Sequence, residues 1–187
     1  MILYINACVR EESRTARLAE ALLQKLGGEY TELCLEEENI LPLDRKALAE
    51  RTALIDAGDY SSPRFERAKQ FAAADTIVIS APFWDLSFPA MLKCYLENIY
   101  VTGIVSKYSD EGLPVGLCRA DKLYYVSTSG GPFIPDYSFN YIRDLATQYF
   151  GIGDVQLIKA EWLDIVGNDP EAIVSDAIAG ILSGNGI

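Results

Sequence analysis

Histidine is absent from the 187 residues of this chain. Its absence excludes catalytic triads that use an imidazole base and metal sites that depend on histidine ligands. Positive charge is also scarce, since 16 Lys and Arg residues face 27 Asp and Glu residues, which gives a net charge of -11. A chain this acidic repels nucleic acid and anionic membrane surfaces, so we expect neither as a partner.

Long apolar runs and paired cysteines are missing as well. No segment approaches the roughly 18 consecutive apolar residues that span a bilayer. The chain begins with the strand-like run MILYI rather than with the basic and apolar regions of a secretion signal. The cysteines are widely spaced and form neither a zinc pattern nor a Cys-x-x-Cys redox pair: Cys8, Cys34, Cys94 and Cys118. We therefore expect a cytoplasmic protein with reduced thiols.

Strand-like segments alternate with helical patterns along the whole chain. Strands are expected near residues 2–8, 30–35, 76–81, 123–128 and 155–162, and helices begin near residues 13, 45, 63, 89, 141 and 170. Residues 103–119 read as an excursion such as a hairpin, and the run TIVISA is typical of a parallel strand covered on both faces. The pattern predicts one α/β domain over residues 1–187. Its architecture would be a three-layer, doubly wound parallel sheet of five strands in the flavodoxin-like order 2-1-3-4-5, with the ligand crevice at the carboxyl ends of the strands.

The loop after the first strand, CVREESRT, ends at a helix N-terminus. Free backbone N–H groups and the helix dipole attract an anion there. Ser13 and Thr15 add hydroxyl groups, and Arg14 adds a positive charge. These residues predict a phosphate site, although Ser and Thr also serve as ordinary helix caps.

Two further loops follow strands at the same end of the predicted sheet. Phe83 and Trp84 follow the third strand and offer a wall for a flat ring, although aromatic residues also pack in cores and at interfaces. Gly130 and Gly131 follow the fourth strand, where glycine allows close approach to a ligand or a positive φ, although a plain turn would also use them. Together the three loops predict a site for a mononucleotide that carries a flat ring.

These segments resemble the flavodoxin-like family of FMN-dependent NADH-azoreductases and NAD(P)H:quinone oxidoreductases. The similarity lies in APFWDLSFPAMLK at residues 81–93, flanked by Ser13-Arg14-Thr15 and Thr128-Ser129-Gly130-Gly131. The family pattern is Pro, an apolar residue, an aromatic, Asn, an aromatic, then Ile-Pro and Leu-Lys. Asp85 therefore stands where Asn is usual, and Cys8 stands where Ser is common.

The resemblance implies an enzyme whose chemistry takes place on FMN, with no catalytic side chain. NADH or NADPH would donate a hydride in a ping-pong reaction, and a small quinone, azo or nitro-aromatic acceptor would take two electrons. Backbone N–H groups of residues 83–86 and 130–131 would stabilise negative charge on the cofactor. The family is typically homodimeric, with each site completed by the second subunit. The implied FMN contacts are Cys8, Ser13, Arg14, Thr15, Pro82, Phe83, Trp84, Asp85, Leu86, Thr128, Ser129, Gly130 and Gly131. The implied substrate contacts are Lys107, Tyr108 and Phe133.

Other functions remain open at this point. Cys8 and Arg14 have the spacing of the loop in low-molecular-weight tyrosine phosphatases, and Asp169 resembles the general acid of that family. Against this, Glu11 and Glu12 would lie beside a dianion. A flavin-binding electron carrier or regulatory module would share the fold, as would a doubly wound domain without a cofactor.

Overall fold

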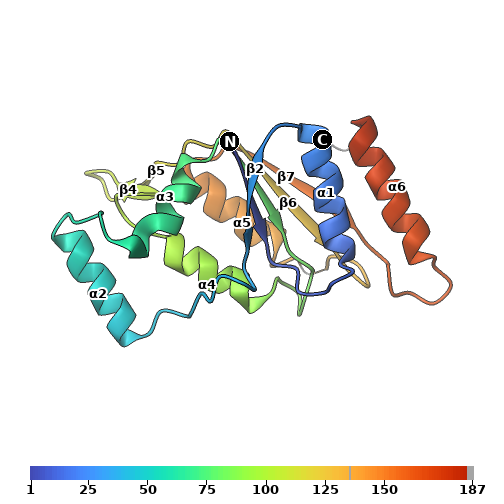
Figure 1. The fold of residues 1–187 in the computed structure, drawn as a ribbon, viewed down its shortest axis with the longest axis horizontal. Helices are drawn as coiled ribbons and strands as arrows, with labels where there is room; N and C mark the ends of the chain where they lie inside the picture. Colours follow the sequence, from blue (N-terminus) through green and yellow to red (C-terminus); the bar gives the residue numbers. More distant parts are fainter. Residues whose placement is uncertain (135, 185–187) are drawn as a thin grey trace.

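A central parallel sheet organises the computed structural model, which describes residues 1–134 and 136–184 (Figure 1). Its strands are β1 (Ile2–Asn6), β2 (Tyr30–Cys34), β3 (Thr76–Ser80), β6 (Lys122–Thr128) and β7 (Asp154–Ala160). They lie in the order β2-β1-β3-β6-β7, and every neighbouring pair is parallel. Numbered along the chain within this sheet, the order is 2-1-3-4-5, so the predicted fold class is confirmed.

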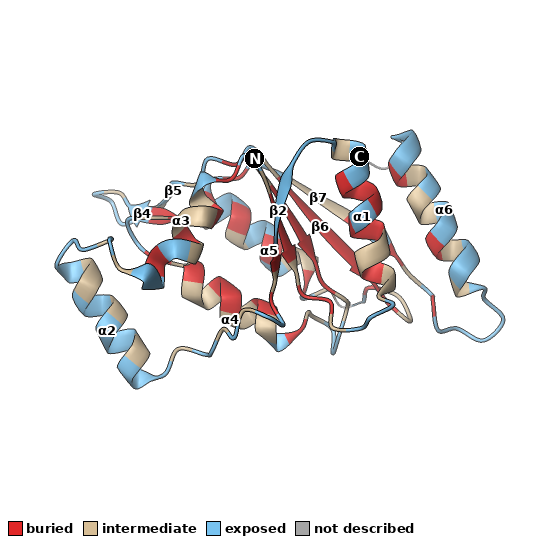
Figure 2. Ribbon diagram, in the orientation of Figure 1, coloured by how far each residue is buried: buried red, intermediate tan, exposed pale blue. Residues whose placement is uncertain are grey.

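Helices cover both faces of the sheet. One face carries α1 (Arg14–Leu26) and α6 (Pro170–Ser183), and the other carries α3 (Glu66–Ala73), α4 (Ala90–Ile99) and α5 (Phe139–Leu145). Alternation along the strands explains the two layers, because successive side chains point to opposite faces. In β1, Leu3 and Ile5 join the core under α3, α4 and α5, while Tyr4 joins the core under α1 and α6. Helix α2 (Arg45–Asp56) buries none of its residues (Figure 2).

The predicted excursion at residues 103–119 contains a hairpin, as expected. Its strands β4 (Ser106–Tyr108) and β5 (Pro114–Gly116) are antiparallel. Every helix among residues 1–134 and 136–184 is too short or too polar to cross a lipid bilayer.

Two predicted helices differ in detail from the structure. The helix expected from residue 63 begins as a 3₁₀ turn, η1 (Pro63–Phe65), before α3. The helix expected at residues 141–150 starts earlier, at Phe139, because the Asp136 carboxylate accepts hydrogen bonds from the N–H groups of Ser138 and Phe139, both at 2.9 Å. It then continues as a π-helical turn, η2 (Ala146–Phe150), and ends at Gly151 in the left-handed region.

Candidate functional site

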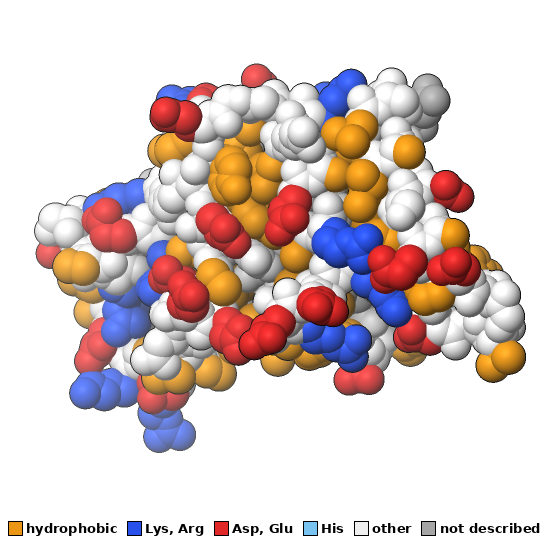
Figure 3. Space-filling model, turned by 45° about the vertical axis from the view of Figure 1, so that its right-hand side comes forward, with side chains coloured by type: hydrophobic (Ala, Val, Ile, Leu, Met, Phe, Trp, Pro, Cys, Tyr) orange, Lys and Arg blue, Asp and Glu red, His pale blue; other side chains and the backbone are white. Residues whose placement is uncertain are grey.

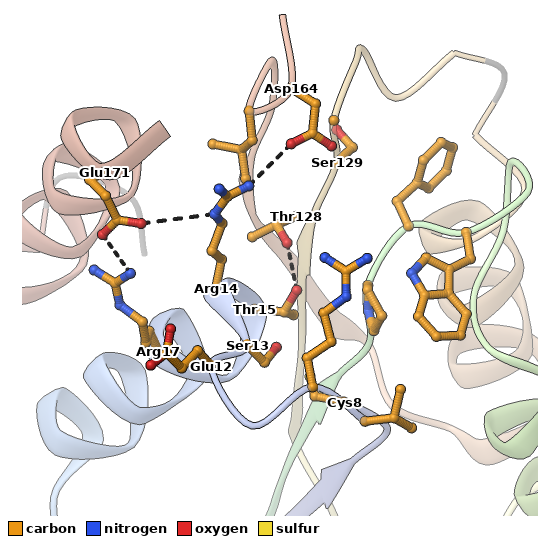
Figure 4. Close-up of a pocket in the computed structure, with 17 residues that line it drawn as sticks. Cys8, Glu12, Ser13, Arg14, Thr15, Arg17, Thr128, Ser129, Asp164 and Glu171 are labelled. Carbon is orange, nitrogen blue, oxygen red and sulfur yellow. Dashed lines mark hydrogen bonds and ion pairs between the residues drawn. The ribbon is translucent and has the colours of Figure 1, made fainter. Parts of the chain in front are cut away.

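The carboxyl ends of β1, β3 and β6 open into a pocket of about 380 Å³ (Figure 4). It lies at the point between β1 and β3 where the connections of the sheet change direction, which is where open α/β sheets bind ligands. The three loops that the sequence placed together do meet around this one hollow. The volume falls within the range of small-molecule sites.

Most of the predicted cofactor contacts line the pocket. These are Cys8, Ser13, Arg14, Thr15, Pro82, Phe83, Trp84, Thr128, Ser129 and Gly130. Six predicted residues are not among those that line it: Asp85, Leu86, Lys107, Tyr108, Gly131 and Phe133. Lys107 and Tyr108 belong to β4, which lies beside α3 in Figure 1, away from the lower ends of the strands. A single chain therefore does not bring these two residues to its own pocket.

The N-terminus of α1 forms one wall. Ser13 caps the helix, since its Oγ accepts a hydrogen bond of 3.2 Å from the N–H of Ala16. The N–H groups of Arg14 and Thr15 donate to no other described residue, as is usual in the first turn of a helix. Buried Thr15 shares a hydrogen bond of 2.6 Å with the Thr128 hydroxyl, which fixes the loop after β6 against α1. This wall therefore offers preorganised donors to an anion.

Charged side chains of both signs surround this wall. Arg14 Nη1 lies 3.2 Å from Asp164 Oδ1, and Arg14 Nε lies 3.9 Å from Glu171 Oε1 (Figure 4). Glu171 also pairs with Arg17 at 2.7 Å. On the face shown in Figure 3, basic side chains likewise lie beside acidic ones.

The sequence prediction missed several residues of the pocket. They are Val9, Arg10, Glu12, Arg17, Leu163, Asp164 and Glu171. A signal for part of this set was present in the sequence, because Leu163 and Asp164 follow the fifth strand of the sheet. They therefore had to lie at the same end as the other three loops.

The aromatic wall is supported from behind. The Phe83 ring stacks on the Phe133 ring, with the ring centroids 4.4 Å apart and the planes inclined by 27°. Phe133 is buried, and its N–H donates to Glu161 Oε1 at 2.7 Å. Lys159 Nζ lies 5.4 Å from the centroid of the same ring. Phe133, predicted to contact the substrate, thus positions Phe83, while Trp84 remains exposed.

A tight turn follows the aromatic pair. Trp84 and Ser87 exchange backbone hydrogen bonds of 3.0 and 2.8 Å, and Asp85 and Leu86 between them have φ values of 50° and 67°. Two positive φ values define a type I′ turn, in which Asn, Asp and Gly are favoured. Asp85 therefore suits the backbone of this turn, as Asn would.

The prediction for backbone donors in this loop was wrong in part. The Phe83 N–H donates to the Thr128 carbonyl at 3.0 Å, and the Trp84 N–H closes the turn, so neither is available to a ligand. Among the described residues, the N–H groups of Asp85 and Leu86 have no acceptor. The available donors are therefore at the tip of the turn rather than beside the strand.

The positive φ expected of the glycine pair is absent at both Gly130 and Gly131, although Gly130 does line the pocket. A Cβ atom at Gly130 would lie 2.4 Å from Asp164 Oδ2, whereas a Cβ atom at Gly131 would meet nothing within 4 Å. The absence of a side chain at Gly130 thus permits the close approach of Asp164, which also donates its N–H to the Gly130 carbonyl at 3.0 Å.

The phosphatase alternative finds no support in this geometry. Cys8 is buried, with its Sγ 3.5 Å from Ser80 Oγ, and burial raises the pKa of its thiol. A nucleophilic cysteine needs the opposite shift. Asp169 does not line the pocket; it caps α6, and its carboxylate accepts hydrogen bonds from the N–H groups of Glu171 and Ala172.

A doubly wound sheet with an anion seat and an aromatic wall at its switch point defines a mononucleotide-binding α/β protein. The family model for the flavodoxin-like fold matches residues 1–183. The FMN-dependent NADH:quinone oxidoreductase of Coprothermobacter proteolyticus is 36% identical over an alignment that covers 95% of this chain and 94% of that protein. FMN-dependent NADH:quinone oxidoreductase 2 of Clostridium acetobutylicum is 38% identical over an alignment that covers 95% of this chain and 94% of that protein. The chain therefore belongs to the flavodoxin-like family that includes these oxidoreductases.

Solved structures share the same architecture. An azoreductase from Bacillus anthracis strain Sterne superposes with a TM-score of 0.82 at 22% identity, covering 98% of this chain and 97% of that chain. An FMN-dependent NADH-azoreductase from Bacillus anthracis strain Ames Ancestor, solved in complex with FMN, gives a TM-score of 0.78 at 22% identity, covering 98% and 96% of the two chains. These likenesses extend over the whole flavodoxin-like fold.

Proposed function

We propose that this chain binds FMN in the pocket and transfers two electrons from NADH or NADPH to a quinone or azo acceptor. The observation that carries the proposal is the meeting of three loops, after β1, β3 and β6, around one nucleotide-sized hollow. The near full-length relatives named FMN-dependent NADH:quinone oxidoreductases support the same activity. Bound FMN would supply the chemistry, by accepting a hydride from the nicotinamide and passing two electrons to the acceptor.

The phosphate group fits the start of α1. The N–H groups of Arg14 and Thr15 are available there, at the positive end of the helix dipole. The Ser13 oxygen accepts from Ala16, which leaves its hydroxyl proton for an anion. Only one of the Thr15 and Thr128 hydroxyls donates in the bond between them, so the second proton is also available.

The flat ring fits between the aromatic wall and the loop after β6. Phe83, held by its stack on Phe133, presents a rigid surface, and exposed Trp84 extends it toward solvent. The N–H groups of Asp85, Leu86, Gly130 and Gly131 donate to no described residue. Gly130 lines the pocket, so its N–H is available to the polar edge of the ring, and the other three belong to the same loops as pocket residues. Fixed backbone donors of this kind stabilise negative charge without reorganisation.

We further propose that the enzyme is a cytoplasmic homodimer. Lys107 and Tyr108 are exposed on β4 and lie outside the pocket of their own chain. Their predicted contact with substrate therefore needs a second subunit. Light scattering behind size-exclusion chromatography measures the assembly directly, and a monomer that turns over at full rate would contradict this part of the proposal.

The central test is a titration of flavin-free protein with FMN, followed by NADH oxidation with menadione as acceptor. We expect one FMN per chain, a flavin absorbance spectrum and steady turnover without a partner reductase, which also separates an enzyme from an electron carrier. Thr15→Val should weaken FMN binding, whereas Lys46→Gln on exposed α2 should not. Protein that stays colourless and leaves NADH unoxidised would refute the proposal.

A further inference from the structure

Three arginines line the pocket, but their charges are not equally free. Arg14 and Arg17 form ion pairs with Asp164 and Glu171, at distances of 2.7 to 3.9 Å. Arg10 also lines the pocket and is exposed, and it forms no ion pair within residues 1–134 and 136–184. The two paired cations are matched by two carboxylates, which leaves Arg10 as the uncompensated guanidinium of the pocket.

The ion pairs of Arg14 join three separate parts of the fold. Glu171 in the first turn of α6 bridges Arg14 and Arg17 of α1, and Asp164 links Arg14 to the loop after β7 (Figure 4). The same loop is attached to the loop after β6, because the N–H groups of Leu163 and Asp164 donate to the carbonyls of Ser129 and Gly130. Turning the Arg14 guanidinium toward a phosphate would break these connections.

We propose that Arg10 is the residue that selects FMN over riboflavin by pairing with the phosphate, and that the Arg14 side chain instead holds α1, α6 and the loop after β7 together. The inference rests on the proposed function, because it concerns the same site. A guanidinium without a carboxylate partner gains more from a phosphate dianion than one that must first give up two partners. Glu12, the remaining acid of the pocket, lies on the side of Arg17 in Figure 4. Arg14 still contributes to the phosphate seat through its backbone N–H.

The test compares the affinities of flavin-free protein for FMN and for riboflavin, which lacks the phosphate. Arg10→Gln removes a charge-assisted hydrogen bond to the phosphate, so it should weaken FMN binding about tenfold or more. Riboflavin binding should stay within about twofold, because the variant loses no contact to the ring. Arg10→Lys, which keeps the charge, should retain most of the preference for FMN.

Arg14→Gln should behave differently. It should lower the thermal midpoint of flavin-free protein by about 2–4 °C and weaken both flavins by a similar factor, because it loosens the pocket as a whole. Lys46→Gln removes one charge from exposed α2 and controls for net charge. It should change neither affinity.

The inference is overturned if Arg14→Gln loses FMN selectively while Arg10→Gln does not, or if Arg10→Gln leaves the ratio of the two affinities unchanged. Wild-type protein that binds riboflavin as tightly as FMN would also overturn it, while leaving flavin use intact. Wild-type protein that binds neither flavin would remove the proposed function itself, which is a separate result.

Discussion

Replacement of Gly130 by alanine tests the contact between the loops after β6 and β7. The added Cβ would lie 2.4 Å from Oδ2, 3.0 Å from Cγ and 3.1 Å from Cβ of Asp164. Rotation about χ1 of Asp164 moves Oδ2 and Cγ but not Cβ, so the carboxylate must turn away and the two loops must separate by a few tenths of an ångström. That movement also breaks the 3.2 Å contact between Asp164 and Arg14.

The expected cost is modest and can be divided into terms. The Arg14 and Asp164 side chains are 33% and 73% exposed, so loss of their ion pair costs at most about 1 kcal/mol. The remaining crowding against Asp164 Cβ, at 3.1 Å, adds about 1 kcal/mol. Alanine lowers the conformational entropy of the unfolded chain, which stabilises the folded protein by about 0.4–1 kcal/mol. Gly130→Ala should therefore lower the free energy of unfolding by about 1 kcal/mol, or the thermal midpoint by about 2–4 °C.

The adjacent glycine is a matched control. Gly131 has an ordinary φ and open space at its Cβ position, so Gly131→Ala should be neutral or stabilising by about 0.4–1 kcal/mol. Asp164→Gly removes every atom that the new methyl group would meet. Urea denaturation of the flavin-free single and double variants then gives the coupling energy, which should be about 1–2 kcal/mol.

Two results would refute this reasoning. One is a Gly130→Ala protein as stable as Gly131→Ala, because the two positions would then be equivalent. The other is a coupling energy near zero with Asp164→Gly, because the cost at Gly130 would then come from somewhere other than Asp164.

Three further predictions concern other parts of the structure. Thr128→Val leaves the buried Thr15 hydroxyl without its 2.6 Å partner, so urea denaturation should show a free energy of unfolding lower by about 1–3 kcal/mol. Thr128→Ser should lower it much less. Equal stability of the two variants would contradict the role of this bond. Asp85→Asn should leave the free energy of unfolding of the flavin-free protein unchanged. Asp85→Val should lower it by about 1–2 kcal/mol, because a β-branched residue is strained in the left-handed region. A Val variant as stable as the wild type would contradict the positive φ of this turn. Burial raises the pKa of the Cys118 thiol from 9.0 to about 12, so the folded protein keeps a proton that the unfolded chain releases. The stability that Cys118 contributes is fully present below the pKa of its thiol in the unfolded chain. It is lost as the pH rises toward the higher pKa of the thiol in the folded protein. The urea concentration at half-unfolding should therefore decrease as the pH is raised from about 8 to 10.5, and it should decrease less in Cys118→Ala. Parallel pH dependences of this concentration in the two proteins would contradict the raised pKa of Cys118.

Much of the fold was predictable because its signals are local. The apolar run of β3 and the alternation of strands with helices determine the class of sheet, and the switch-point rule then places three loops together. The ends of the elements were less predictable. The early start of α5, for example, depends on a hydrogen bond from the N–H of Phe139 to the carboxylate of Asp136, in a segment that shows no regular pattern.

The details of the pocket depend on contacts between distant segments. Arg14 and Asp164 are 150 residues apart in the sequence, and they meet only because α6 and the loop after β7 pack beside α1. The backbone donors at Asp85 and Leu86 depend on a turn type that is usually predicted from a glycine in the sequence, and this turn contains none. Residue types alone therefore indicated a nucleotide site, but not which of its charges and N–H groups remain free.

The bridge from Glu171 to α1 also has a consequence for synthesis on the ribosome. The first loop of the pocket emerges early, whereas the carboxylate that holds Arg14 and Arg17 in place belongs to the last helix of the described chain. The residues of β1 and β3 are synthesised well before this carboxylate. The charged wall of the pocket is therefore complete only when α6 has docked on α1.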